Sequence, residues 1–326
     1  MSETVGKPRP VDRGDRRSGH RLGAPGVRMA IVALGISAVA IAGCSSSQIT
    51  TAAAPTVVSP TVYQDKLRSA NIVVAAAMDH FATARSPEEA RAGLDQAAAV
   101  VGEAAHLLDI NPPAEVQALH RELLAGLRQL AVDLSHLRDQ ALSRTLCAAP
   151  SIMASVSNGP GMTSLRSVRE ALRSGRAGVS YHWGDSLPAP AQLLERRLAT
   201  GQLIDSMHRD GRGQLHIDNG TGHDAVVELV HNGKPVASVY VGKGSKTIVD
   251  NIDDGSYELF YTSGIDWDGQ LKTFTRSCLF KRFETPVSFT TMPIDGAIRS
   301  TTQAISLRDK MGKNARMAVP AQSFPR

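Results

Sequence analysis

The spacing of apolar residues changes period once along this chain. In residues 62–146, apolar side chains recur at steps of three and four, as on the buried face of an amphipathic helix. From Gln214 onward, apolar and polar positions alternate, and Gly, Asn and Asp separate the alternating stretches as they do in β-turns. The pattern predicts an α+β fold with two domains, an N-terminal helical bundle and a C-terminal antiparallel β-sandwich.

Three long helices are expected in the first half. The first carries an apolar stripe over residues 63–81. Ser86-Pro87-Glu88-Glu89 has the form of a capping box with proline at the first helical position, so a second helix begins there. Asn111-Pro112-Pro113 ends it, and the third helix carries a leucine-rich seam over residues 116–141. A shorter fourth helix is predicted for residues 164–173.

Seven or eight short strands are expected in the second half. Asn232-Gly233 is the strongest hairpin signal, because a type I′ turn needs positive φ at both central residues. The predicted strands cover residues 215–217, 225–231, 236–241, 246–252, 256–262, 271–283, 287–291 and 301–307. Short strands at such regular intervals are typical of a sandwich.

An apolar run near the N-terminus predicts a targeting segment. Residues 29–42 are too short to span a bilayer, which needs roughly 20 apolar residues, and a basic stretch precedes them. Ile41-Ala42-Gly43-Cys44 looks like a bacterial lipobox. We therefore expect a signal peptide over residues 1–43 and a lipidated Cys44 that anchors the exported protein to the outer face of the cytoplasmic membrane. A buried helix and an uncut anchor are the alternatives, and the export route stays open.

The domain boundaries follow from composition. Residues 44–60 are small, polar and interrupted by proline, which is typical of a flexible tether. The helical bundle is expected over residues 61–174. Residues 175–213 show no clear period and are interpreted as a connector that packs on both neighbours. The β-sandwich and its tail take residues 214–326.

Charge argues against a nucleic-acid partner. Residues 1–43 hold seven Lys or Arg and three Asp or Glu, so the formal charge of +5 falls to about +1 in the remainder. A nucleic-acid-binding protein is expected to carry a basic surface on its folded part. The remaining partners to consider are the membrane, reached through lipidated Cys44, and a cell-wall polymer or an envelope protein.

The three cysteines fit an exported lipoprotein. Once Cys44 is assigned to the lipid, Cys147 and Cys278 remain, enough for one disulfide in an oxidising compartment. Spacing alone leaves open the alternative of two separate buried thiols.

Two carboxylate–histidine pairs in the helices have the spacing of di-metal bundle ligands. They are Glu103 with His106 and Asp133 with His136. At about 100° per residue, these side chains point away from the apolar stripes, so we expect a solvated surface, no metal site and no cofactor.

Several stretches of the second half resemble a known type of protein. Residues 214–221, 224–227, 238–241 and 254–257 read QLHIDNGT, DAVV, SVYV and DGSY. With residues 264–268, 274–278, 280–283 and 312–324, they are similar to an uncharacterised β-domain, of prealbumin-like or immunoglobulin-like type, in actinobacterial lipoproteins that place a helical region before it. The resemblance implies a disulfide between Cys147 and Cys278. It implies no activity.

The remaining candidate is an expected loop over residues 264–269. Asp266, Trp267 and Asp268 place two carboxylates around an aromatic side chain, which suits Ca²⁺ binding, sugar stacking or a simple structural turn. His182 and Asp185 form another pair, but no nucleophile motif accompanies them. We therefore expect a binding or scaffolding module and not an enzyme; the alternative is an envelope hydrolase or a metal-dependent enzyme.

Overall fold

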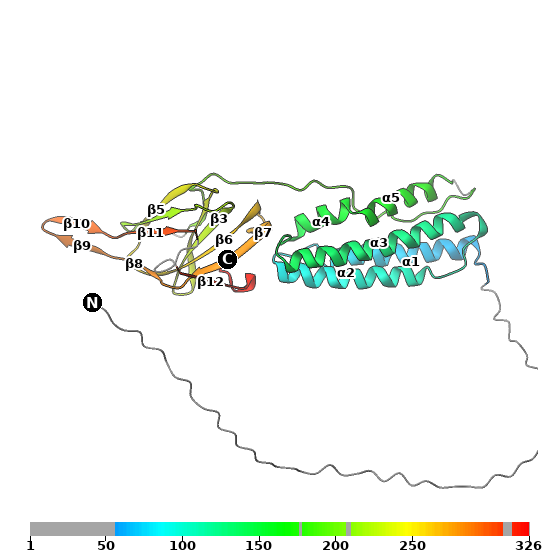
Figure 1. Ribbon diagram of the computed structural model, residues 1–326, viewed down its shortest axis with the longest axis horizontal. Coiled ribbons are helices and arrows are strands. Elements are labelled where there is room, and N and C mark those ends of the chain that lie inside the picture. Colours follow the sequence, from blue (N-terminus) through cyan, green and yellow to red (C-terminus); the bar gives the residue numbers. More distant parts are fainter. Residues whose placement is uncertain (1–55, 176–177, 207–209, 309–314, 326) are drawn as a thin grey trace, which may run out of the picture. The chain divides into compact units, whose positions relative to one another are not determined.

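The chain has an α+β fold in which helices precede a region rich in antiparallel sheet (Figure 1). The computed structural model describes residues 56–175, 178–206, 210–308 and 315–325. The predicted signal peptide, Cys44 and most of the predicted tether lie outside these residues. Within the described residues, no helix has the length and hydropathy of a membrane-spanning segment.

Five α-helices lie in the described first half. They are α1 (Pro60–Asp79), α2 (Pro87–Leu107), α3 (Gln117–Leu142), α4 (Ala149–Asn158) and α5 (Pro160–Arg173), with a short 3-10 helix, η1 (Ala114–Val116), before α3. The capping box is confirmed at α2, where the Ser86 hydroxyl accepts from the Glu89 backbone N–H at 3.2 Å. The Glu89 carboxylate reaches back one residue further than expected and accepts from the Arg85 N–H at 2.8 Å.

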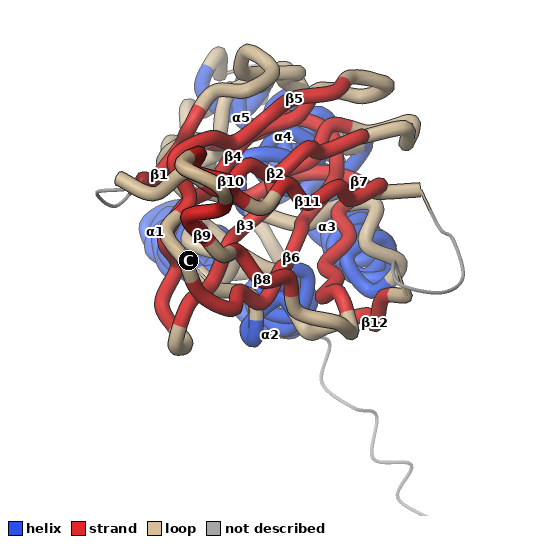
Figure 2. Tube along the Cα trace, turned by 90° about the vertical axis from the view of Figure 1, so that its left-hand side faces the viewer, coloured by secondary structure: helices blue, strands red, loops and turns tan. Residues whose placement is uncertain are grey.

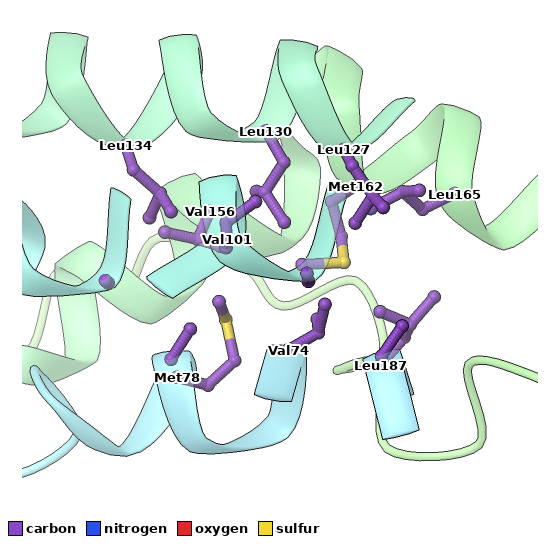
Figure 3. Packing of buried hydrophobic residues seen from close by; sticks show 14 of the residues in the cluster. Val74, Met78, Val101, Leu127, Leu130, Leu134, Val156, Met162, Leu165 and Leu187 are labelled. Carbon is purple, nitrogen blue, oxygen red and sulfur yellow. The ribbon is translucent and has the colours of Figure 1, made fainter. Parts of the chain in front are cut away.

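The helices share one apolar core. The predicted stripes of α1, α2 and α3 supply fully buried side chains such as Leu67, Leu94 and Leu127. Figure 3 shows Leu127 and Leu130 of α3 facing Met162 and Leu165 of α5. Three connector residues, Tyr181, Trp183 and Leu187, complete the same core, as expected for a segment that packs on its neighbours.

Twelve strands lie in the described second half. They are β1 (Leu203–Ser206), β2 (Gly213–Asp218), β3 (Asp224–His231), β4 (Lys234–Val241), β5 (Lys246–Ile252), β6 (Gly255–Asp268), β7 (Thr273–Phe283), β8 (Val287–Phe289), β9 (Thr291–Ile294), β10 (Ala297–Ser300), β11 (Thr302–Ser306) and β12 (Arg316–Ala318); a 3-10 helix, η2 (Ala321–Ser323), follows.

The strands form two sheets and a separate hairpin. The large sheet has the order β1-β4-β3-β6-β7-β12, with β8 also paired to β6, and the small sheet has the order β11-β2-β5 (Figure 2). Among the described strands, β9 and β10 pair only with each other. The predicted type I′ turn is confirmed between β3 and β4, with φ of 50° at Asn232 and 74° at Gly233. The β11–β2 pair is parallel, so the β-region is not wholly antiparallel.

Both sheets bury apolar side chains in a common cluster. Leu215 and Ile217 of β2 belong to it together with Val227 of β3 and Tyr261 of β6. The opposite face of the large sheet carries a second, aromatic cluster that includes Phe274. Strand β3 is therefore buried on both faces, which explains why Ala225, Val226 and Val227 are apolar at successive positions; Glu228 is buried in the middle of the strand.

The structure differs from the sequence prediction in several elements. Helix α4 was not predicted, because it is only ten residues long and small residues dominate its sequence. Helix α5 begins at Pro160, four residues before the predicted start at Ser164. Strand β1 lies inside the predicted connector, and the β9–β10 hairpin was not expected. Strand β6 runs on to Asp268, through most of the residues predicted to form a loop.

Candidate functional site

The expected ligand loop is not exposed. Asp266, Trp267 and Asp268 form the buried end of β6, and only 4 % of the Trp267 surface is accessible. The indole packs edge-on against Phe274, with ring centroids 5.0 Å apart. Sugar stacking, one of the roles considered for Trp267, needs an open ring face, and this ring is covered by the sheet's own core.

Arg196, from the connector, occupies both carboxylates of this segment. Its Nε donates to Asp266 Oδ1 and its Nη2 to Asp266 Oδ2, each at 2.8 Å. Its Nη1 donates to Asp268 Oδ2, also at 2.8 Å. The Thr275 hydroxyl adds a hydrogen bond to Asp266 Oδ2 at 2.6 Å. Ca²⁺ was one of the ligands considered for these two carboxylates. In the structure, both carboxylates bind an arginine of the same chain.

The environment of Asp266 keeps it ionised. Burial alone would raise its pKa, but the hydrogen bonds from Arg196, Thr275 and the Arg196 backbone N–H outweigh burial, and the pKa lies below its ordinary value. The same contacts raise the pKa of the Arg196 guanidinium. Asp266 also has a φ of 62°, and the β6–β7 pairing has an irregularity just before it, between Ser263 and Ile265.

A second arginine makes a similar contact one residue later. The Nε of Arg197 donates to Asp224 Oδ2 at 2.7 Å, and the Tyr240 hydroxyl donates to the same oxygen at 2.6 Å. The Lys243 backbone N–H donates to Asp224 Oδ1 at 2.8 Å. Burial would raise the pKa of Asp224, yet these hydrogen bonds together hold it below its ordinary value.

These two arginine clusters fasten the connector to the β-region. Downstream, Gly201 N–H donates to the Tyr240 carbonyl at 2.8 Å, and β1 then pairs with β4. Sequence reasoning missed Arg196, Arg197 and Asp224, because their partners are remote in sequence. The adjacent arginines in an otherwise aperiodic segment were the available signal, since two neighbouring cations require carboxylates wherever they are part-buried.

Cys147 and Cys278 are joined by a disulfide at a sequence separation of 131. It links the segment between α3 and α4 to β7. The Cys147 N–H and the Ser151 hydroxyl both donate to the Thr275 carbonyl, at 2.8 and 2.7 Å. The junction of the helices with β7 is therefore both covalent and hydrogen-bonded.

The helical candidates for metal ligands do not converge. Glu103, His106 and His136 are exposed, as their angular positions predicted. Asp133 instead accepts from the Gly161 N–H at 2.8 Å and so caps the N-terminus of α5. Within the described residues, no three His, Cys, Asp or Glu side chains are grouped as a metal site requires.

An open groove of about 630 Å³ lies on the small sheet. Its lining comes from all three strands of that sheet: His216, Ile217, Asp218, Lys246, Thr247, Ile248, Ala304, Ile305 and Ser306. Because side chains alternate along each strand, one face enters the common core and the other faces this groove. Ile248 on the groove face is 48 % exposed.

The strand register places the side chains of the groove in rows that run across the three strands. His216 lies opposite Ala304 on one side and Ile248 on the other. The next outward-facing row holds Asp218 and Lys246, whose charged groups are 3.5 Å apart. A row with an apolar side chain on each side of the His216 imidazole is thus bordered by an ion pair, an arrangement that suits apolar contact with polar contacts at the rim.

Comparisons with models of protein families, with curated proteins and with solved structures give no match to this chain. The geometry of its own residues is therefore the basis for a functional proposal.

Proposed function

We propose that this protein is a lipid-anchored binding or scaffolding module of the bacterial cell envelope. In this proposal, lipidated Cys44 holds the mature chain on the outer face of the cytoplasmic membrane. A helical-bundle domain and a β-sandwich domain follow the tether, and the outer face of the β11–β2–β5 sheet is the binding surface.

The groove on that sheet is the observation that carries the proposal. It combines the exposed Ile248 with a rim of Asp218 and Lys246, on strands whose opposite face is fixed in the core. A surface supported by a packed sheet is already rigid, so a ligand that binds there does not have to order it.

The disulfide and the two arginine clusters support a scaffolding role. They fasten the helices to β7 and the connector to β3 and β6, at points remote in sequence. A module that transmits position between a membrane anchor and a partner requires such fixed internal connections, whereas a linker would leave the two regions free.

The test is a capture experiment with the full chain purified from membranes in detergent. Immobilised protein is exposed to isolated wall polymer and to solubilised envelope proteins, and the wild type is compared with Ile248→Glu. The control is Ile72→Glu on α1, where the isoleucine is 63 % exposed and lies far from the groove in sequence.

We expect the wild type and the Ile72→Glu variant to capture the same component, and Ile248→Glu to lose it, because a carboxylate in the apolar row must be desolvated. Equal capture by all three proteins would show that the groove is not the binding surface.

A further inference from the structure

The β9–β10 hairpin exposes apolar side chains on both of its faces. Strand β10 is exposed throughout, and in β9 only Thr291 is half-buried. Met292 and Ile298 have 54 % and 55 % of their surface accessible. Figure 1 shows the hairpin projecting at the end of the β-region, beyond β8 and β11. A two-stranded hairpin alone in water is marginally stable, so contact with another surface would stabilise it.

The hairpin is held firmly at its base. The Thr291 N–H and hydroxyl donate to the two oxygens of Asp254, each at 2.8 Å. The hydroxyls of Thr290 and Thr301 lie 2.9 Å apart at the same end. At the tip, Asp295 and Gly296 have φ of 50° and 74°, as a tight type I′ turn requires. A fixed base and a regular turn give the projecting strands a defined direction.

The register separates the hairpin into two different faces. Met292 lies opposite Arg299, and Ile294 opposite Ala297, so these four side chains share one face. Pro293 and Ile298 lie opposite each other on the other face.

Pro293 limits how another chain can approach the hairpin. It has no N–H, so it cannot donate to a strand added along the β9 edge. The faces of the hairpin are therefore better suited to contact than the β9 edge. The face with Met292 and Ile294 offers two large apolar side chains, and Arg299 adds a cation beside them.

The groove lies next to the hairpin in the chain. Only Thr301 separates the end of β10 from the start of β11, which supplies Ala304 to the groove. Every copy of the chain thus carries an apolar projection and an apolar groove on adjoining segments. A two-fold axis relating two copies would place each projection against the other copy's groove in the same operation, which gives a closed contact.

We propose that the groove of the β11–β2–β5 sheet binds the β9–β10 hairpin of a second copy, so that the protein forms a reciprocal dimer. Met292 and Ile294 lie against the row of Ala304, His216 and Ile248 in the partner. The hairpin carries one cation and one anion, Arg299 and Asp295. They can pair with Asp218 and Lys246 of the groove rim, because the ion pair between those two residues is long, at 3.5 Å, and exposed, so its members can exchange partners in the dimer. This inference rests on the proposed function, since it names the occupant of the groove assigned there.

The test is sedimentation velocity of the full chain, purified from membranes in a density-matched detergent, over a range of concentrations. We expect a dimer. Met292→Glu in the hairpin and Ile248→Glu in the groove should each raise the dimer dissociation constant roughly tenfold or more, because each places a carboxylate in an apolar contact. Circular dichroism of each variant checks that these exposed substitutions leave the fold intact.

Two controls make the assignment specific. Ile298→Glu alters an equally exposed residue on the opposite face of the hairpin and should leave the dimer unchanged. Mixing the Met292→Glu and Ile248→Glu proteins should restore mixed dimers, because one hairpin and one groove are still intact between them. A contact elsewhere on the chain would be insensitive to both variants and would not show this complementation.

The outcomes separate this inference from the proposed function. A monomer at every concentration, or a dimer unaffected by Met292→Glu and Ile248→Glu, overturns the inference. If Ile248→Glu still abolishes envelope capture in that case, the groove binds another partner and the proposed function stands. If the Ile248→Glu variant keeps both the dimer and the envelope capture, the inference and the proposed function are both contradicted.

Discussion

Arg196 and Asp266 form a two-pronged ion pair in which Nε and Nη2 each donate to a different carboxylate oxygen at 2.8 Å. The arginine belongs to the connector and the aspartate to the buried end of β6, 70 residues away in sequence. The pair therefore holds the connector against the large sheet, together with the Trp267 N–H, which donates to the Arg196 carbonyl at 3.0 Å.

Replacing Arg196 with alanine should destabilise the protein strongly, because Asp266 would stay buried without its cation. We expect a loss of about 2 to 3 kcal/mol in the free energy of unfolding, less than for a fully buried pair since Arg196 is part-exposed. Urea unfolding at neutral pH measures it.

Arg68→Ala is the control for this variant, since the ion pair of Arg68 with Asp65 is exposed on α1. Its loss should stay below about 1 kcal/mol. Equal losses in the two variants would mean that the connector contact contributes no more than a surface pair.

His120 should make the helical region sensitive to mild acid. It is buried on α3, and its Nδ1 lies 3.2 Å from the Tyr63 hydroxyl. Burial lowers its pKa below the ordinary value, with smaller opposing effects from Leu108 and Asp109. As the pH falls, His120 therefore gains its proton at a higher pH in the unfolded chain than in the folded one. The free energy of unfolding decreases as the pH drops below about 6.5.

The measurement is the free energy of unfolding at several pH values between about 5 and 7.5. His120→Gln, which keeps a polar partner for Tyr63, should flatten the slope in this window. His136→Gln, an exposed histidine on the same helix, should keep the wild-type slope. If His120→Gln leaves the pH dependence of the free energy of unfolding unchanged, that dependence comes from other titratable groups.

Two helical glycines should respond in opposite directions to alanine. A Cβ at Gly161 would lie 2.4 Å from the Leu130 nitrogen, because α5 approaches the α3 backbone there. We expect Gly161→Ala to cost about 1 to 3 kcal/mol through this overlap.

A Cβ at Gly102, on α2, would meet nothing within 4 Å. Gly102→Ala should therefore stabilise the protein by about 0.5 to 1 kcal/mol, since alanine restricts the unfolded chain and favours the helix. Thermal unfolding of both variants compares them directly. A neutral Gly161→Ala would show that the two helices separate easily at this point.

The disulfide should contribute strongly to stability because it closes a loop of 131 residues. In the chain-entropy description such a closure is worth about 5 kcal/mol at most, and about 3 to 5 kcal/mol is a reasonable expectation. The Cys147→Ser/Cys278→Ser double variant should lose this amount in non-reducing urea unfolding. Reduced wild-type protein should match the variant. Native protein with two free thiols and no response to reductant would contradict the disulfide.

The sequence was sufficient for elements with a strong local pattern. The α2 cap at Ser86, the α3 seam and the Asn232-Gly233 turn each depend on neighbours within a few residues, and each is found as predicted. The β9–β10 hairpin was missed despite Asp295-Gly296, because its short strands lack a clear alternation of apolar and polar residues.

The interpretation of residues 264–269 failed for a different reason. Gly264, Asp266 and Asp268 are turn-forming residue types, and locally they favour a loop. Their strand conformation depends on pairing with β7 and on Arg196, both distant in sequence. The groove could not be predicted from the sequence either, because its lining depends on the pairing of β11 with β2.

The lipid anchor at Cys44 remains a prediction, because this residue lies outside the described part of the chain. Protein from the native host should give an intact mass for a chain that begins at Cys44 and carries fatty acids, since the lipobox is cut just before the cysteine. Cys44→Ala cannot accept the thioether-linked lipid and should keep residues 1–43. An unprocessed wild-type chain without lipid would remove the membrane partner from the proposed function. The groove and the hairpin would be unaffected by that result, because both depend on residues after 200.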